Sequence, residues 1–114
     1  MLPKENRLKK KKDFEGVFKK GKGFNEGFLF LKIEKNNLEK SRFAFIVSKK
    51  INKKAVDRNK IKRRLREVVR KSLPRINPGI DGVFVVQRDV KDKEFSEIKK
   101  TTIEILKKAK VLDD

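Results

Sequence analysis

The segment from Asp57 to Pro74 limits the possible folds of this chain more than any other stretch, because it reads as an amphipathic helix. Its apolar residues recur at the spacing of one buried helical stripe, which comprises Ile61, Leu65, Val68, Val69 and Leu73. Asp57 belongs to the residue types that cap helix starts, and Pro74 cannot continue a helix. We therefore expect a helix between these residues that packs one face on a hydrophobic core.

The opposite face of this helix is cationic. At about 100° per residue, one sector collects Asn59, Lys62, Arg63, Arg66 and Arg70, with Arg58 beside it and Lys60, Arg64 and Lys71 continuing the positive surface. Glu67 is the only acid after Asp57, so the face lacks the regular Glu–Lys pairs that stabilise an ordinary solvated face. Cations near the helix N-terminus also oppose the macrodipole. The pattern therefore favours binding of phosphate groups.

The composition of the whole chain supports an anionic partner. Its 114 residues, enough for one domain, carry 34 Lys and Arg against 16 Asp and Glu, a formal net charge of +18. The chain has no apolar run of membrane-spanning length and no signal-peptide core, so we expect it in the cytosol with no membrane partner. Because His and Cys are absent, the usual general base, zinc ligands and thiol nucleophiles are missing. We expect no catalytic residue and no metal site in the protein itself.

Two acidic pairs are the remaining candidates for Mg²⁺ ligands. Asp13 lies two residues before Glu15, and Asp89 lies three residues before Asp92. Such pairs are more often surface charges or residues at helix starts than metal ligands, and no further acids converge on them in the sequence.

The remaining elements follow from turn residues and periodicity. Residues 1–12 hold six cations and one acid, which is typical of a basic arm that can become ordered on a partner. Residues 13–20 read as a short helix that Gly21 ends, and residues 92–111 as a closing helix. Residues 28–33 and 42–48 read as two strands that pair in an antiparallel hairpin, and residues 81–88 as a later strand. The sequence thus predicts a single α+β domain over residues 1–114, with one mixed sheet of three to four strands and three helices in the order helix-strand-strand-helix-strand-helix.

Two motifs resemble the bacterial ribonuclease P protein subunit. Residues 45–51 read Phe-Ile-Val-Ser-Lys-Lys-Ile, and residues 58–69 read Arg-Asn-Lys-Ile-Lys-Arg-Arg-Leu-Arg-Glu-Val-Val. The similarity covers nearly the whole chain, since residues 6–9, 13–18 and 81–86 also follow the family's order. The resemblance implies a protein that is not the catalyst but binds the ribonuclease P RNA, which removes the 5′ leader of precursor tRNA with Mg²⁺. The protein is expected to be monomeric in that complex and to contact the leader.

The resemblance also implies the residues that bind. The RNA-facing set is Arg58, Asn59, Lys60, Lys62, Arg63 and Arg66, preceded by Lys49 and Lys50. The leader cleft would use Phe14 and Phe18, with a basic rim of Lys10, Lys11 and Lys12. For the two rings, core packing competes with leader binding, and the sequence favours Phe14 as the cleaner leader contact. The family's fold further implies an uncommon left-handed crossover at the central helix.

Three positions depart from the family pattern. Lys60 stands where Arg is usual, and Lys cannot make the bidentate contact of Arg. Asn52 replaces a common Gly in a connector one residue longer than usual, where Asn can still adopt a left-handed backbone. The strand near Leu31 lacks an aromatic residue often seen in the leader cleft.

Composition alone leaves other functions open. A ribosomal or other structural RNA-binding protein fits the charge and size equally well. An autonomous nuclease is disfavoured by the missing His and Cys, and a DNA-binding helix-turn-helix by the strand character before Asp57.

Overall fold

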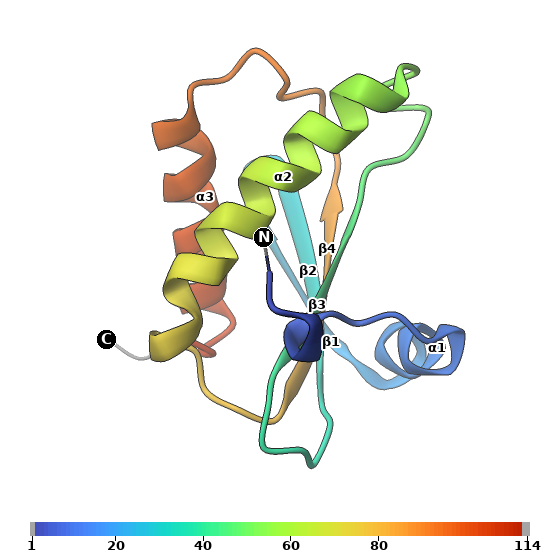
Figure 1. The fold of residues 1–114 in the computed structure, drawn as a ribbon, viewed down its shortest axis with the longest axis vertical. Coiled ribbons are helices and arrows are strands. Elements are labelled where there is room, and N and C mark those ends of the chain that lie inside the picture. The colour runs from blue at the N-terminus through green and yellow to red at the C-terminus, as the bar shows by residue number, and fades with distance from the viewer. Residues whose placement is uncertain (1, 113–114) are drawn as a thin grey trace.

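The structure is a computed structural model, and it describes residues 2–112. It confirms the α+β class, with three helices and a mixed sheet of four strands (Figure 1). The elements in chain order are α1 (Lys11–Lys20), β1 (Lys22–Glu26), β2 (Leu29–Lys35), β3 (Arg42–Ile46), α2 (Ala55–Ser72), β4 (Ile80–Val86) and α3 (Phe95–Lys108). Two short 3₁₀ turns, Lys4–Asn6 and Leu73–Arg75, precede α1 and follow α2.

The order of strands in the sheet is β1-β2-β4-β3, so the expected hairpin between residues 28–33 and 42–48 is wrong. β4 lies between β2, its antiparallel neighbour, and β3, its parallel neighbour. The physical reason is burial on both faces, since β4 carries the continuous apolar run Val83–Val86 and such a strand belongs in the middle of a sheet. The hairpin of this fold is instead formed by β1 and β2, joined at Gly27 and Phe28.

β1 was not predicted from the sequence because it has little strand character. It is a mostly exposed edge strand in which Phe24 is the only apolar residue. β3 and β4 are parallel, and the chain passes from one to the other through α2. This connection is the crossover at the central helix that the resemblance implies, while its left hand stays a prediction.

Helix α2 begins at Ala55, two residues before the predicted cap. Lys54 occupies the cap position in an extended conformation, and no side chain caps the helix, so the capping role expected of Asp57 is wrong. Asp57 instead lies in the first turn, where a carboxylate compensates the helix dipole, and its Oδ2 is 3.7 Å from Nζ of Lys91. The helix ends at Ser72, and Pro74 falls in the 3₁₀ turn that follows.

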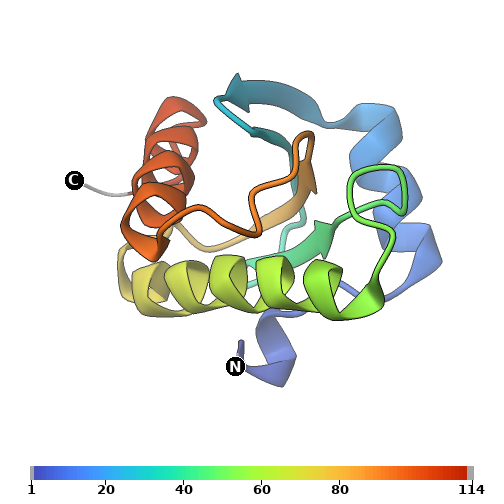
Figure 2. The ribbon, with the colours of Figure 1, turned by 90° about the horizontal axis from the view of Figure 1, so that it is seen from above.

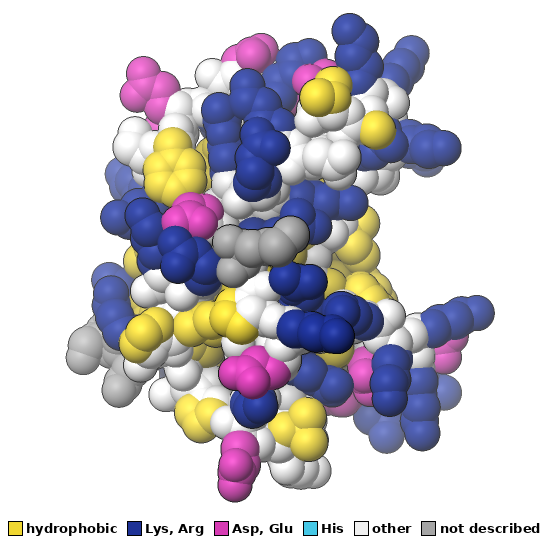
Figure 3. All heavy atoms as spheres, in the orientation of Figure 1, with side chains coloured by type: hydrophobic (Ala, Val, Ile, Leu, Met, Phe, Trp, Pro, Cys, Tyr) yellow, Lys and Arg dark blue, Asp and Glu magenta, His cyan; other side chains and the backbone are white. Residues whose placement is uncertain are grey.

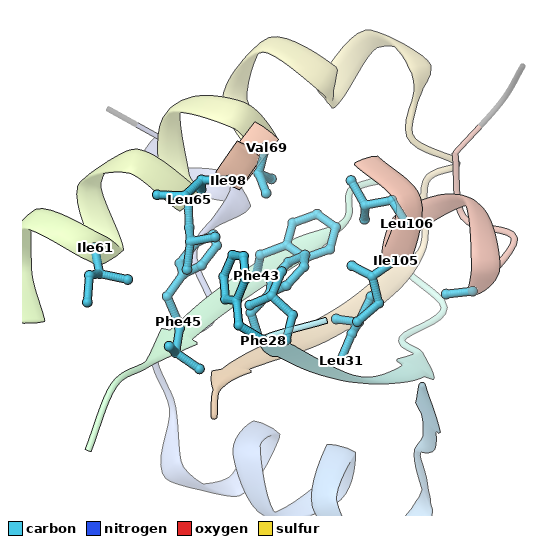
Figure 4. Packing of buried hydrophobic residues seen from close by; sticks show 14 of the residues in the cluster. Phe28, Leu31, Phe43, Phe45, Ile61, Leu65, Val69, Ile98, Ile105 and Leu106 are labelled. Atoms are coloured by element: carbon cyan, nitrogen blue, oxygen red, sulfur yellow. The ribbon is translucent and has the colours of Figure 1, made fainter. Parts of the chain in front are cut away.

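The main core lies between one face of the sheet and the pair α2 and α3, while α1 covers the other face (Figure 2). Figure 4 shows side chains of α2, α3 and the strands converging in this core; those labelled include Ile61, Leu65, Val69, Ile98, Ile105, Leu106, Phe43 and Phe45. The predicted apolar stripe of α2 is therefore buried, except that Leu73 is only partly buried. In α3, Ile98, Ile105 and Leu106 are buried, whereas Phe95 at the start of the helix is 39% exposed. No helix in residues 2–112 is long and apolar enough to cross a membrane.

The N-terminal arm is packed against the domain, contrary to the expectation of a segment that orders on a partner. Leu2 and Leu8 are buried, and the backbone N–H of Leu8 donates to the carbonyl of Phe43 at 2.9 Å. Arg7 forms a parallel bridge with Phe43, so the arm covers part of the free edge of β3. We call residues 2–10 the N-terminal strap, because helix α1 already begins at Lys11.

Candidate nucleic-acid interface

The solvent face of α2 presents a cationic surface. Asn59 and Arg63 are exposed, whereas Lys60, Lys62 and Arg66 are half-buried. The guanidinium carbon of Arg66 lies 6.0 Å from the ring centroid of Phe45, a cation–π contact that holds this side chain in place. Four residues of this helix, Asn59, Arg63, Arg66 and Glu67, line a pocket of about 350 Å³.

The charges of this face are only partly neutralised. Nη2 of Arg70 lies 2.5 Å from Oε1 of Glu67, and this hydrogen bond raises the pKa of Arg70 and lowers the pKa of Glu67. Lys60, Lys62 and Arg63, by contrast, form no ion pair with any acid among the residues that the structure describes. These three cations are therefore available to an anionic ligand.

Two arginines of α2 bind carbonyl groups of neighbouring loops. Nη1 of Arg58 donates to the carbonyls of Asn52 at 2.9 Å and Lys53 at 2.8 Å, which fixes the connector between β3 and α2. Nη1 of Arg64 donates to the carbonyl of Lys93 at 3.0 Å in the connector between β4 and α3. The predicted RNA-binding residue Arg58 thus also positions the segment that carries Lys49 and Lys50, both of which are exposed.

Asn52 acts through its side chain and not through a left-handed backbone, since the residue does not have a positive φ. It is buried, and its side-chain hydrogen bond lowers the pKa of Asp89, as does the backbone N–H of Lys91, which donates to Oδ1 of Asp89 at 3.0 Å. The departure from Gly therefore joins the connector before α2 to the segment after β4.

A second candidate surface lies where α1 crosses the other face of the sheet. Val17 is fully buried there in a small cluster with Leu8, Ala44 and Val83. Phe14 packs on the same cluster and is half-buried, whereas Phe18 is 40% exposed. By exposure alone, Phe18 is freer than Phe14 to contact a ligand, while the leader role of both rings stays a prediction.

Phe30 is a third aromatic residue on this surface, and it was not predicted from the sequence. It is half-buried in β2, opposite Val85 of β4 and Asn25 of β1. Because its neighbour Leu31 belongs to the main core, strand alternation places Phe30 on the α1 face. The same alternation can be read from the sequence, where Phe30 stands one position before Leu31. We define the α1 cleft as the surface formed by Phe14, Phe18 and Phe30.

The position of α1 on the sheet is fixed at both ends of the helix. At its C-terminal end, Nζ of Lys32 donates to the carbonyl of Phe18 at 2.5 Å. Gly21 then allows a close approach, since a Cβ there would lie 2.3 Å from the carbonyl oxygen of Val17. At its N-terminal end, Nη1 of Arg42 lies 3.3 Å from Oδ2 of Asp13, and the same guanidinium binds Asp81 through Nε at 2.9 Å and Nη2 at 2.7 Å.

Lysines stand at the start of α1. Lys10, Lys11 and Lys12 are all exposed. In the space-filling view, the surface is hollowed beside α1, with hydrophobic side chains on the floor and Lys and Arg side chains on both sides (Figure 3). A surface with apolar side chains on its floor and cations on both sides can bind an extended polyanion that carries planar rings.

Some of the acids considered as Mg²⁺ ligands have partners within the protein. Asp13 is bound to Arg42, and Asp89 accepts the backbone N–H of Lys91. No group of three or more acids within residues 2–112 converges in a way that could hold a metal ion.

Comparisons with known proteins agree in fold and sequence. The family model for ribonuclease P matches residues 2–110. The ribonuclease P protein component of Clostridium botulinum (strain Loch Maree / Type A3) is 37% identical over 107 residues, covering 93% of this chain and 96% of that protein. The same component of Pseudanabaena sp. (strain PCC 6903) is 38% identical over 113 residues, covering 98% and 97%.

Solved structures of similar proteins share the architecture. The RNase P protein of Staphylococcus aureus superposes with a TM-score of 0.86 at 31% identity, covering 95% of this chain and 98% of that chain. The RNase P protein of Thermotoga maritima gives a TM-score of 0.82 at 29% identity, covering 90% and 96%.

Proposed function

The chain belongs to the bacterial ribonuclease P protein family, and from this premise we propose that it is the protein subunit of an endoribonuclease that removes the 5′ leader of precursor tRNA. In this proposal the protein works in the cytoplasm, as a monomer within the complex. The catalytic RNA, which uses Mg²⁺, performs the hydrolysis. The protein supplies two binding surfaces, one for that RNA and one for the leader.

The observation that carries the proposal is the unneutralised cationic face of α2. Lys60, Lys62 and Arg63 have no acidic partner in the described part of the chain, and Arg66 is held beside them on the ring of Phe45. A face of this kind binds phosphates and releases the counterions condensed on the RNA. We assign this face, with Asn59, Lys49 and Lys50, to the catalytic RNA.

We assign the α1 cleft to the leader. Aromatic side chains offer stacking platforms that accept any base, and nearby lysines attract the backbone of a single strand. Phe18 and Phe30 provide partly exposed rings, and Lys10, Lys11 and Lys12 provide the charge. A cleft of this composition binds a leader with little dependence on its sequence.

The proposal is tested by incubating precursor tRNA at low Mg²⁺ with the protein alone, with ribonuclease P RNA alone, and with both. We expect leader removal only in reactions that contain the RNA, and faster removal when the protein is added. Cleavage by rigorously RNA-free protein would contradict the division of labour. Failure of the protein to bind or stimulate the RNA would favour a different structural RNA as its partner.

A further inference from the structure

A pocket of about 240 Å³ lies where the N-terminal strap, β3, α1 and α2 meet. Three cationic residues line it, namely Arg7 and Lys9 of the strap and Arg66 of α2. Phe14 of α1 contributes an aromatic side chain, and no acidic residue is among the lining residues. The pocket therefore combines positive charge with an aromatic wall in a space of limited size.

The strap holds Arg7 in a fixed place and presents Lys9 directly after a buried anchor, Leu8. Nε of Arg7 donates to the carbonyl of Leu2 at 2.8 Å, and the N–H of Leu8 donates to the carbonyl of Phe43 at 2.9 Å. Leu2 and Leu8 are buried, so the strap is anchored on both sides of Arg7. Charges presented in this way lose less conformational entropy on binding than charges on a free tail.

Arg66 is also held in place and not neutralised. Its guanidinium lies over Phe45, whose ring stacks on Phe84 with a centroid distance of 5.3 Å. None of the three pocket cations forms an ion pair with an acid in the described residues. An anionic ligand would therefore balance the positive charge of this pocket.

The pocket is placed between the two surfaces already described. Arg66 also lines the pocket on the α2 face, and Phe14 is part of the α1 cleft. A nucleotide in the pocket could therefore belong to an RNA strand that continues onto either surface. A free phosphate would use the cations alone, whereas a nucleotide would use both the cations and the aromatic wall.

We propose that this pocket binds one unpaired nucleotide of an RNA strand, with its phosphate at Arg7, Lys9 and Arg66 and its base against Phe14. The inference rests on the proposed function, to which it adds a nucleotide site at the edge of β3. Two of its residues, Arg7 and Lys9, belong neither to the α2 face nor to the α1 cleft. Variants at these positions therefore separate the pocket from the proposed function.

The first test measures whether the base contributes to binding. The full chain is titrated with uridine 5′-monophosphate and, separately, with ribose 5-phosphate, while backbone amide signals are followed by NMR. We expect the nucleotide to bind about five- to 140-fold more tightly, which corresponds to the 1 to 3 kcal/mol of one stacked base. Its shifts should centre on Leu8, Lys9 and Ala44. Equal affinities, or shifts confined to other regions, would overturn the proposal.

The second test compares two lysines of the same strap. Lys9→Gln removes a cation that lines the pocket, whereas Lys4→Gln removes one exposed cation outside it, so the net charge changes equally. We expect Lys9→Gln to weaken binding of uridine 5′-monophosphate by about tenfold, the loss of one charge-assisted hydrogen bond, and Lys4→Gln to leave it nearly unchanged. Equal effects of the two variants would show that the nucleotide is bound by general electrostatic attraction, and would refute a specific site in the pocket.

A third measurement tells failure of the pocket from failure of the proposed function. Arg63→Gln alters the α2 face without touching the pocket lining. If Arg63→Gln weakens binding of ribonuclease P RNA while the nucleotide titrations show no base contribution, the proposed function stands and the pocket assignment is wrong. If the catalytic RNA does not bind but the nucleotide does, the pocket stands and its RNA is a different one.

Discussion

Arg63 and Arg64 are neighbours in the sequence but have different surroundings. Arg63 is exposed and has no ion-pair partner among the described residues, while Nη1 of Arg64 donates to the carbonyl of Lys93. We expect Arg63→Gln to weaken binding of the catalytic RNA and to flatten the slope of log K against log salt by roughly 0.7 to 0.9, one phosphate contact. Its free energy of unfolding should change by less than about 0.5 kcal/mol, as for other exposed sites.

Arg64→Gln is the matched control because it removes the same charge from the same helix. It should lower the free energy of unfolding by about 1 kcal/mol, the net value of a hydrogen bond, and change the salt slope less than Arg63→Gln. The measurements are filter binding over a range of salt and urea unfolding. Identical behaviour of the two variants would mean that the α2 face is only a solvated surface.

Arg42 carries a second prediction at the scale of single residues. Its hydrogen bonds to Asp81 are the main cause of the raised pKa of Arg42, and the Asp81 side chain is only 5% exposed. Arg42→Met would leave this buried carboxylate with the amide of Asn36 as its remaining side-chain donor. We expect a loss of about 3 kcal/mol of unfolding free energy, the low end for a broken buried pair.

The contrast for Arg42 is an exposed ion pair. Lys40 and Glu5 lie 2.8 Å apart, but their side chains are 53% and 58% exposed. Lys40→Met should therefore cost less than about 1 kcal/mol. Urea unfolding measures both variants, and similar losses for the two would show that Asp81 does not depend on Arg42.

The sequence predicts which residues of α2 are buried or cationic, but not which cations are already bonded. Helical periodicity alone identifies the stripe with Ile61 and Leu65. Arg58 and Arg64 look the same as Arg63 in the sequence, because the carbonyls they bind come from connectors whose paths depend on the whole fold. Phe30 differs from these arginines, because the period-two alternation of β2 can be read from the sequence and places this ring on the face opposite Leu31.

At the scale of elements, the three helices were predictable to within about three residues at each end, but the strand partners were not. The polar loop between β2 and β3 suggests a hairpin, yet β4 takes the place between them because it buries both of its faces. Local turn residues say nothing of a strand that arrives more than thirty residues later. The position of the α1 cleft depends on this sheet, since Phe30 and Val85 are brought together only by the pairing of β2 with β4.

Helix α1 gives the prediction for this scale. Phe18 is 40% exposed, so Phe18→Ala should leave the melting temperature of the free protein nearly unchanged. In the assembled enzyme it should weaken binding of leader-bearing precursor by about 1 to 3 kcal/mol, the value of one stacking platform, and spare mature tRNA. Binding of both RNAs and thermal unfolding are the measurements.

Phe14→Ala provides the internal comparison within the same helix. Phe14 packs on the cluster of Val17, Ala44 and Val83, so its truncation should lower stability, by less than the 3 to 5 kcal/mol lost at a filled core site. Equal loss of leader-bearing and mature tRNA in Phe18→Ala would remove that ring from the leader site.

At the scale of the whole molecule, the net charge of +18 opposes the stability of the free protein. α2 concentrates this effect. Lys62 lies four residues after Arg58 and four before Arg66, so it makes two like-charge contacts along one helix face. Each such contact costs about 0.2 to 0.5 kcal/mol. The cationic face of α2 therefore lowers the stability of the helix that carries it.

Lys62→Gln should therefore stabilise the free protein at low salt while it weakens RNA binding. We expect a higher melting temperature at about 10 mM salt, where screening extends over about 30 Å, and a smaller gain at about 1 M, where it extends over about 3 Å. Glu67→Gln is the control of opposite sign, since Glu67 binds Arg70 at 2.5 Å and lies 3.8 Å from Lys71, so its loss should lower the melting temperature at low salt. A lower melting temperature for Lys62→Gln, or a shift independent of salt, would show that packing of the Lys62 stem outweighs repulsion on this face. A rise in melting temperature that becomes smaller as salt is added, together with weaker RNA binding, would show that Lys62 contributes to ligand binding and lowers the stability of the fold.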